Sequence, residues 1–169
     1  TELLEETIEK LRGHEREERI DPEIRLGLSA FFPEKYLPDP NQRLQFYQRL
    51  AGADDDRQIF DIADELQDRY GNLPIPGELL LGVMRLRIIL KELRVELLEY
   101  DGRRLSLRFH ASTRVSPELI GNLLKTEPQR YSLSADFKLA IRCERWQGEE
   151  LLRETRRELQ KFQSGEGSL

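Results

Sequence analysis

Four consecutive residues of this chain have the types that could hold a nucleotide. Asp64, Glu65, Leu66 and Gln67 read in the order of the acidic box with which helicases bind magnesium and ATP. Such a box ends an apolar strand beside a phosphate-binding loop, and the sequence has neither G-x-x-x-x-G-K-[ST] nor G-x-G-x-x-G. The four residues lie instead in an amphipathic helical pattern, so we interpret the similarity to an ATPase box as accidental.

Other catalytic chemistry has equally little support in the sequence. The two histidines, His14 and His110, have no cysteine or further histidine at metal-ligand spacing. The single Cys143 falls in a strand pattern, and no serine stands in a G-x-S-x-G elbow. We therefore predict no catalytic residue, no cofactor and no metal site, and a chain that is not an enzyme by itself.

The polar side of the helix around residue 64 carries a stripe of one charge. At about 100° per residue from Ile59, the carboxylates fall at about 140°, 180°, 200° and 240°, opposite the apolar face; in that order they are Asp64, Asp68, Asp61 and Glu65. The pattern alone favours a solvated helix face. A docking surface for a basic partner is the alternative, because a stripe of one sign selects a complementary patch. A nuclease-like metal cluster is disfavoured, since no basic groove accompanies the carboxylates.

Several helices and hairpins are needed to position this stripe. Apolar residues at helical spacing predict helices at about 40–50, 54–70, 77–95 and 148–163, the third being the most buried. Ser116 and Pro117 are the N-cap and first residue of another helix. Alternation predicts a strand from Ile24, a hairpin over 95–110 with Asp101-Gly102 at its turn, and a strand pair from 130–134 and 137–143.

The strands cluster around hairpin signals rather than alternating singly with helices. This order predicts an α+β fold, a small antiparallel sheet packed by several helices in a single compact domain. We place the domain at residues 21–163. Residues 1–20 form a thin helical stripe and a charged linker before it, and residues 164–169 a disordered tail after it.

Composition limits the possible partners. The chain has 169 residues, 38% of them hydrophobic, and 27 Lys and Arg against 32 Asp and Glu give a net charge of −5. The chain thus lacks the excess positive charge that drives binding to a phosphate backbone, and we expect little or no direct DNA binding. No apolar run approaches a membrane span, and a lone cysteine suits a reducing compartment, so we predict a cytoplasmic protein without membrane contact.

One basic feature keeps a different function open. Arg85, Arg87, Lys91 and Arg94 lie on the predicted central helix, and the last three share a face at i, i+4 and i+7. They could contact nucleic acid as part of a helicase-like motor. The solvent-exposed side of a buried helix would have the same pattern, and we favour that interpretation.

Three segments in close succession resemble a known family. The stretches EIRLGLSAFFPEKYLPD, RLQFYQRL and ELQDRYGNLP are similar to the C-terminal domain of the bacterial transcription-repair coupling factors (Mfd), known as the TRCF domain. The resemblance covers roughly residues 20–143. Its most specific motif is E-L-x-D-R-[FY]-G, here Glu65 to Gly71. The first residues, LLEETIEKLRG, look like the end of the motor region that precedes this domain in the family.

The resemblance implies a function that composition does not show. Full-length members are ATP-driven DNA translocases that displace stalled RNA polymerase and recruit the excision-repair protein UvrA. Their C-terminal domain is non-catalytic and autoinhibitory: it docks on the protein's own UvrB-like N-terminal module, masks the UvrA-binding surface and restrains the motor. The family's docking positions match Glu65, Asp68 and Arg69. The resemblance thus implies that the acidic stripe is a partner-binding surface.

Overall fold

The computed structural model describes residues 19–164, and these form one α+β unit. The elements are, in chain order, β1 (Glu23–Arg25), α2 (Pro40–Ala51), α3 (Asp56–Tyr70), α4 (Ile75–Leu93), β2 (Val95–Tyr100), β3 (Arg104–Phe109), α5 (Pro117–Thr126), β4 (Tyr131–Leu133), β5 (Lys138–Arg142) and α6 (Gly148–Ser164). The predicted α+β class is confirmed. The predictions for residues 1–18 and 165–169 lie outside the described residues, and α6 ends one residue beyond the predicted boundary at 163.

The five strands form one sheet in the order β1-β2-β3-β5-β4. Three neighbouring pairs are antiparallel, as predicted, while β1 runs parallel to β2 with Glu23 opposite Leu97. A parallel pair needs a long crossover connection. Helices α2, α3 and α4 provide it, because all three lie between β1 and β2 in the chain.

The predicted hairpin of β2 and β3 is confirmed, with its turn one residue further along. The backbone amide of Asp101 donates to the carbonyl of Arg104, so Gly102 and Arg103 occupy the turn. Gly102 has a φ of 94°, a conformation that favours glycine. The Asp101 carboxylate accepts the amides of Arg103 and Arg104 at 2.8 and 2.7 Å, which closes the turn.

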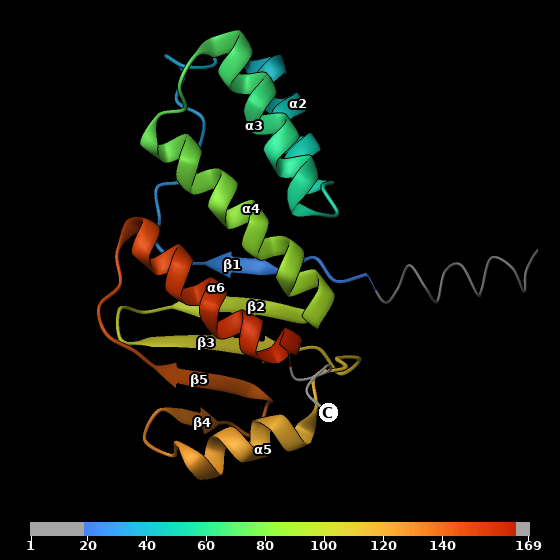
Figure 1. Cartoon of the computed structure of the whole chain (residues 1–169), viewed down its shortest axis with the longest axis vertical. Coiled ribbons are helices and arrows are strands. Elements are labelled where there is room, and N and C mark those ends of the chain that lie inside the picture. The colour runs from blue at the N-terminus through green and yellow to red at the C-terminus, as the bar shows by residue number, and fades with distance from the viewer. Residues whose placement is uncertain (1–18, 165–169) are drawn as a thin grey trace, which may run out of the picture.

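Two apolar clusters meet along α4. One lies between α4, α6 and the inner face of the sheet, and the other holds α2 and α3 against the opposite side of α4. Leu86 and Leu90 belong to the first cluster and Leu80 to the second, so the helix predicted to be most buried is the link between them. Figure 1 shows α2 and α3 at one end of the molecule and the sheet with α5 at the other, with α4 between.

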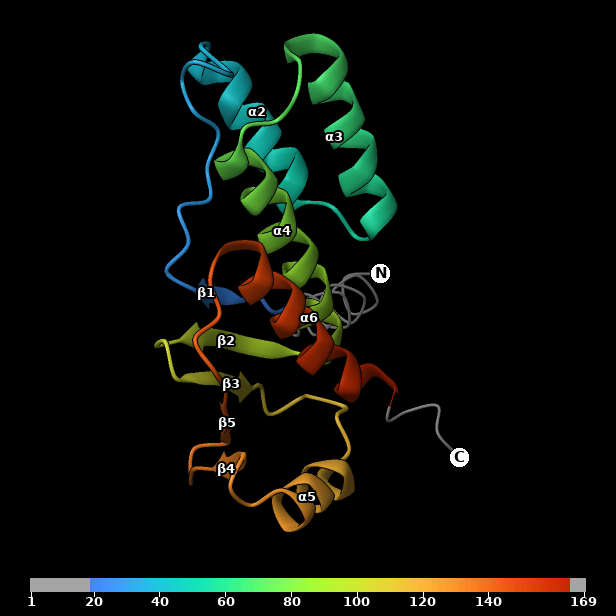
Figure 2. The same cartoon turned by 60° about the vertical axis from the view of Figure 1, so that its left-hand side comes forward.

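The described helices leave one face of the sheet open. Helices α4 and α6 pack together and cover the inner face, where Leu105, Leu107, Leu139 and Ile141 have no exposed surface. Figure 2 shows the strands with α4 and α6 on one side and no helix of the described chain on the other. The polar side of α3 at one end and the open sheet face at the other are therefore the two candidate functional surfaces.

Candidate docking surface

Helix α3 presents the acidic stripe because its apolar side is buried. Ile59 and Leu66 have no exposed surface and Ile62 is 5% exposed, as the helical spacing predicted. Asp55 caps the helix by accepting the amide of Gln58 at 2.8 Å. The predicted stripe of carboxylates therefore faces away from the core.

The carboxyl end of α3 is held by an aromatic residue of the preceding loop. The Tyr36 hydroxyl lies 3.1 Å from the carbonyl of Leu66 and 2.8 Å from that of Gly71, so it caps this end of the helix. The Tyr70 hydroxyl contacts Gln42 on α2, and the rings of Tyr36 and Tyr70 lie 5.9 Å apart. Gly71 has φ 86° and ψ −168°, a mirror-extended conformation that ends the helix. These contacts fix the position of residues 65–69 in space.

Glu65 is held by an arginine of the neighbouring helix. Its carboxylate accepts two hydrogen bonds from Arg49 of α2, at 2.6 and 3.2 Å, and lies 3.5 Å from Arg69. The hydrogen bond from Arg49 is the main cause of a lowered Glu65 pKa, and together with the charges of Arg49 and Arg69 it outweighs the opposing effect of desolvation. Glu65 and Arg69 lie at i and i+4 on α3, whereas Arg49 reaches Glu65 from another helix, a contact that helical spacing does not indicate.

Arg69 is ordered by aromatic rings as well as by charge. Its guanidinium lies 5.7 Å from the centre of the Phe46 ring and 5.1 Å from that of Tyr70, within reach of cation–π attraction. The Arg49 guanidinium also lies 5.1 Å from the Phe46 ring. Two cations therefore flank Glu65 on one side of α3, and both are held over apolar surface.

Asp68 has a different environment. It is exposed, and among residues 19–164 it has no ion pair or side-chain hydrogen bond. Asp61 and Asp64 on the same stripe are also exposed, and they too have no ion pair or side-chain hydrogen bond among residues 19–164. The structure thus divides the three residues implied by the family resemblance: Glu65 and Arg69 belong to a compensated cluster, and Asp68 presents an uncompensated charge beside it.

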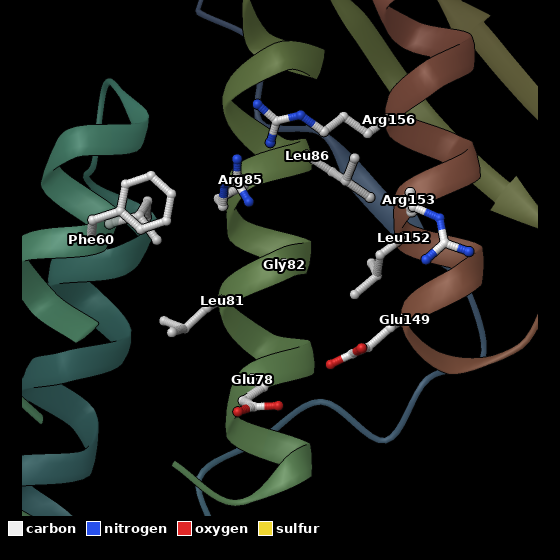
Figure 3. A pocket seen from close by; sticks show the side chains of 11 residues that line it. Phe60, Glu78, Leu81, Gly82, Arg85, Leu86, Glu149, Leu152, Arg153 and Arg156 are labelled. Atoms are coloured by element: carbon white, nitrogen blue, oxygen red, sulfur yellow. The ribbon is translucent and has the colours of Figure 1, made fainter. Parts of the chain in front are cut away.

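A hollow of about 310 Å³ lies on the other side of α3, between it, α4 and α6. Figure 3 shows Phe60 reaching from α3 toward Arg85 on α4, and Leu152 of α6 facing Gly82. The Arg85 guanidinium lies 4.9 Å from the Phe60 ring, which is half exposed. Apolar side chains of all three helices line the hollow, together with the charged residues Glu78, Arg85, Glu149, Arg153 and Arg156.

Asp56, beside this hollow, joins three helices. Its Oδ2 accepts hydrogen bonds from Arg85 of α4 at 3.1 Å and from Arg156 of α6 at 2.9 Å. Desolvation raises the Asp56 pKa, but the hydrogen bonds and charges of Arg156 and Arg85 outweigh it and the net shift is downward. Asp56 is also the first residue of α3, where a negative charge complements the helix dipole.

The basic stripe on α4 is engaged inside the chain. Arg85 pairs with Asp56, Arg87 forms an ion pair with Asp21, and Lys91 donates to the carbonyl of Ala51 at 3.2 Å. Arg94 donates to the Ser112 hydroxyl at 3.0 Å. Desolvation, followed by repulsion from Arg87, lowers the Lys91 pKa. The stripe therefore has few cations left for a phosphate backbone.

Within residues 19–164, no three His, Cys, Asp or Glu side chains gather as they would around a metal ion. None of the helices in that range is both long and apolar enough to cross a membrane.

Comparisons with known proteins match the segment that contains α3 to a domain family. Residues 26–120 match the family model of the TRCF domain. The transcription-repair-coupling factor of Myxococcus xanthus is 30% identical over 159 residues, covering 94% of this chain and 13% of that protein. That of Escherichia coli strain K12 is 33% identical over 144 residues, covering 82% of this chain and 12% of that protein.

A solved structure agrees in fold. It is described as the crystal structure of the C-terminal domain of transcription-repair coupling factor, and it matches with a TM-score of 0.70 at 19% identity. The match covers 86% of this chain and 96% of that one. The chain thus spans only about an eighth of the length of these two relatives, and its match to the solved domain covers nearly all of that domain.

Proposed function

Because this chain belongs to the TRCF domain family, the C-terminal domain of transcription-repair coupling factors, we propose that it is a non-catalytic autoinhibitory domain. It docks on the UvrB-like N-terminal module of its own protein. The docked state masks the UvrA-binding surface and restrains the ATP-driven DNA-translocating motor. Engagement of RNA polymerase by the parent protein releases the domain.

The observation that carries this proposal is the exposed charge of Asp68 beside the ordered pair of Glu65 and Arg69. Asp68 has no partner among residues 19–164, and the neighbouring side chains are fixed by contacts to α2. A charge on a rigid helix loses little conformational entropy when a partner binds. This arrangement suits recognition of arginine side chains on the UvrB-like module.

The three residues have different roles in the docked state. Asp68 is the main anchor, since it can form a new ion pair without breaking an existing one. Glu65 already accepts two hydrogen bonds from Arg49, so it contributes by sharing its carboxylate with a further arginine. Arg69 orients Glu65 and adds a cation that selects for an alternating charge pattern on the partner.

Weak charge pairs are appropriate for a switch. Exposed ion pairs are worth roughly 0.2 to 1 kcal/mol each and fall with salt, whereas pairs buried by docking are worth more. A few such pairs can hold a closed state that competing contacts still open. We therefore expect docking to weaken markedly between low and high ionic strength.

The direct test mixes this chain with the separate N-terminal module and measures the dissociation constant at two salt concentrations. The double variant Glu65→Ala/Asp68→Ala should bind at least about 30-fold more weakly, the equivalent of ~2 kcal/mol for interfacial pairs. Asp61→Ala/Asp64→Ala is the matched control, because it removes two carboxylates from the same stripe outside the proposed contact. An equal loss of affinity in both double variants would mean that the stripe acts only through its overall negative charge and not through specific contacts of Glu65 and Asp68.

The same variants test autoinhibition in the parent protein. The Glu65→Ala/Asp68→Ala parent should bind UvrA without polymerase and hydrolyse ATP faster when unstimulated. Single variants separate the roles: Asp68→Ala should open the protein more than Glu65→Ala. The proposal fails if the double variant folds normally while UvrA binding and unstimulated ATP hydrolysis stay at the wild-type level.

A further inference from the structure

The open face of the sheet is more basic than the chain as a whole. Cross-strand pairing places Arg104, Ser106 and Arg108 of β3 beside Arg142, Ala140 and Lys138 of β5, on the side opposite the buried leucines. Each pair has its side chains about 5 Å apart at Cβ. Between the two charged pairs lies the pair of Ser106 and Ala140, whose side chains are small. Two like-charged pairs therefore stand on one surface, separated by one small pair.

The pair of Arg108 and Lys138 has carboxylates close to both of its cations. Arg108 lies 3.7 Å from Asp136, and Lys138 lies 3.1 Å from Glu99. Glu99 also pairs with Arg25 of β1, so the positive charges at this end of the face have carboxylates beside them. The repulsion expected between facing cations is thus removed by groups of the chain itself.

The second pair, Arg104 and Arg142, has no such compensation. Both side chains are exposed, and among residues 19–164 neither has a carboxylate within 4.0 Å. The backbone amides of Arg103 and Arg104 donate to the Asp101 carboxylate and are the main causes of its lowered pKa, and the charge of Arg104 has a smaller effect in the same direction. Like charges directly opposite each other destabilise a strand pair, and a bound anion would reverse that effect.

A third arginine borders the same place. A hollow of about 160 Å³ is lined by the uncompensated pair together with Arg130, Ser132 and Ala140. Arg130 contacts Glu158 of α6 through one terminal nitrogen, while its Nε is buried without a hydrogen-bond acceptor in the described chain. The hollow thus combines two uncompensated guanidinium groups with the polar residue Ser132, while the guanidinium of Arg130 at its border is engaged by Glu158.

We propose that this hollow, bordered by Arg104, Arg130 and Arg142, binds a carboxylate side chain of an acidic segment in a protein partner. A guanidinium presents a planar fork of donors that matches a carboxylate in two-point contact. The hollow, at about 160 Å³, has room for a small group such as a carboxylate but not for a length of extended chain. The site lies at the end of the molecule opposite α3, so it is independent of the docking surface proposed above.

The charges around the hollow favour a protein segment over nucleic acid. A duplex is held by many phosphate contacts, whereas the uncompensated cations here are confined to one end of the face. A long polyanion lying across the sheet would meet Glu99 and Glu23 on β2 and β1. An acidic protein segment can place one or two carboxylates at the hollow and direct the rest of its chain away.

The test titrates the isotope-labelled chain with an acetylated hexaglutamate peptide and follows amide and arginine Nε signals by NMR. Signals of Arg104, Ser132 and Arg142 should shift together. The double variant Arg104→Gln/Arg142→Gln should weaken binding by about tenfold or more, as expected when charge-assisted hydrogen bonds are lost. The control Arg108→Gln/Lys138→Gln removes an equal charge from the compensated pair and should weaken binding by less than about threefold.

Thermal unfolding of the same variants separates binding from folding. Without peptide, Arg104→Gln should unfold at the same temperature as wild type or higher, because a repulsive contact is removed. Equal weakening in both double variants, or no shifts at the hollow, would overturn the proposal. Tighter binding of a short DNA duplex than of the peptide, abolished by Arg104→Gln/Arg142→Gln, would also overturn it and assign the hollow to nucleic acid.

Discussion

Arg49 on α2 and Glu65 on α3 form a two-point ion pair, with nitrogen–oxygen distances of 2.6 and 3.2 Å. The pair joins two helices that also meet through Phe46, Leu50 and the apolar side of α3, and through the contact of Tyr70 with Gln42. It also places a helix–helix contact inside the proposed docking surface. Glu65 thereby contributes to the fold as well as to the proposed docking, whereas Asp68 is held by no ion pair within residues 19–164.

Removing Arg49 should free the Glu65 carboxylate. In Arg49→Ala we expect the Glu65 pKa to rise toward its ordinary value, because the hydrogen bond that lowers it is gone. A carboxyl group whose pKa is lower in the folded state adds stability above its unfolded pKa, and loses it as pH falls through the folded pKa. The variant should therefore lose about 0.2 to 1 kcal/mol of unfolding free energy at pH 7 and almost none near pH 2.

NMR titration of Glu65 and urea unfolding at both pH values measure this effect. Arg57→Ala is the control, since Arg57 is an exposed cation of α3 without an ion pair in the described chain. A loss of equal size at both pH values would mean that Arg49 acts through its packing on Phe46.

Leu66 distinguishes the core side of α3 from the docking side. It has no exposed surface and belongs to the helical cluster, so Leu66→Ala should lower the unfolding free energy by about 2 to 5 kcal/mol. Leu44→Ala on α2 is the matched control, because Leu44 is 55% exposed and should cost no more than about 0.5 kcal/mol. Chemical denaturation compares the two, and similar losses would contradict the assigned orientation of these helices.

Gly71 should resist replacement because of its backbone. With φ 86° and ψ −168° it occupies a region almost restricted to glycine, although a Cβ at this position would meet no atom within 4 Å. Gly71→Ala should therefore lower the unfolding free energy by about 1 to 3 kcal/mol through strain alone. Gly121→Ala on α5, also in open space but helical, should raise it by about 0.5 to 1 kcal/mol. Thermal or urea unfolding that gives both variants the same sign would contradict this account.

Asp56 should stabilise the junction of α3, α4 and α6 through its charge. Asp56→Asn keeps the shape and an acceptor oxygen but loses the charge that receives Arg85 and Arg156. Because the folded pKa of Asp56 is lowered, its contribution exists above the unfolded pKa and disappears as pH falls through the folded one. We expect a loss of about 1 kcal/mol at pH 7, discounted for partial exposure, and little difference near pH 2.

Unfolding at the two pH values tests this expectation, with Asp61→Asn as the control. Asp61 lies on the same helix, is exposed and has no ion pair among the described residues. If Asp56→Asn still lowers the unfolding free energy at low pH, Asp56 acts through its hydrogen bonds and not through its charge.

The sequence by itself determined the elements and their orientation. Helix caps, apolar spacing and turn residues act within a few positions of the chain, so the helices predicted at 40–50 and 54–70 agree with the structure to within two residues, and Ser116 is an N-cap as predicted. The same local geometry placed Leu66 inside and Asp68 outside. The family resemblance also rests on short motifs, and the match of residues 26–120 to the TRCF domain confirms it.

Only the tertiary structure decided which side chains from distant segments meet. Periodicity shows the face on which Glu65 lies, but not that Arg49, 16 positions away, would reach it from another helix. The parallel pairing of β1 with β2 follows from where α2, α3 and α4 return the chain, and no local pattern in β1 encodes it. The uncompensated pair of Arg104 and Arg142 arises from strand register across the sheet. Partnership between distant side chains depends on how whole elements pack, and that is a property of the complete fold.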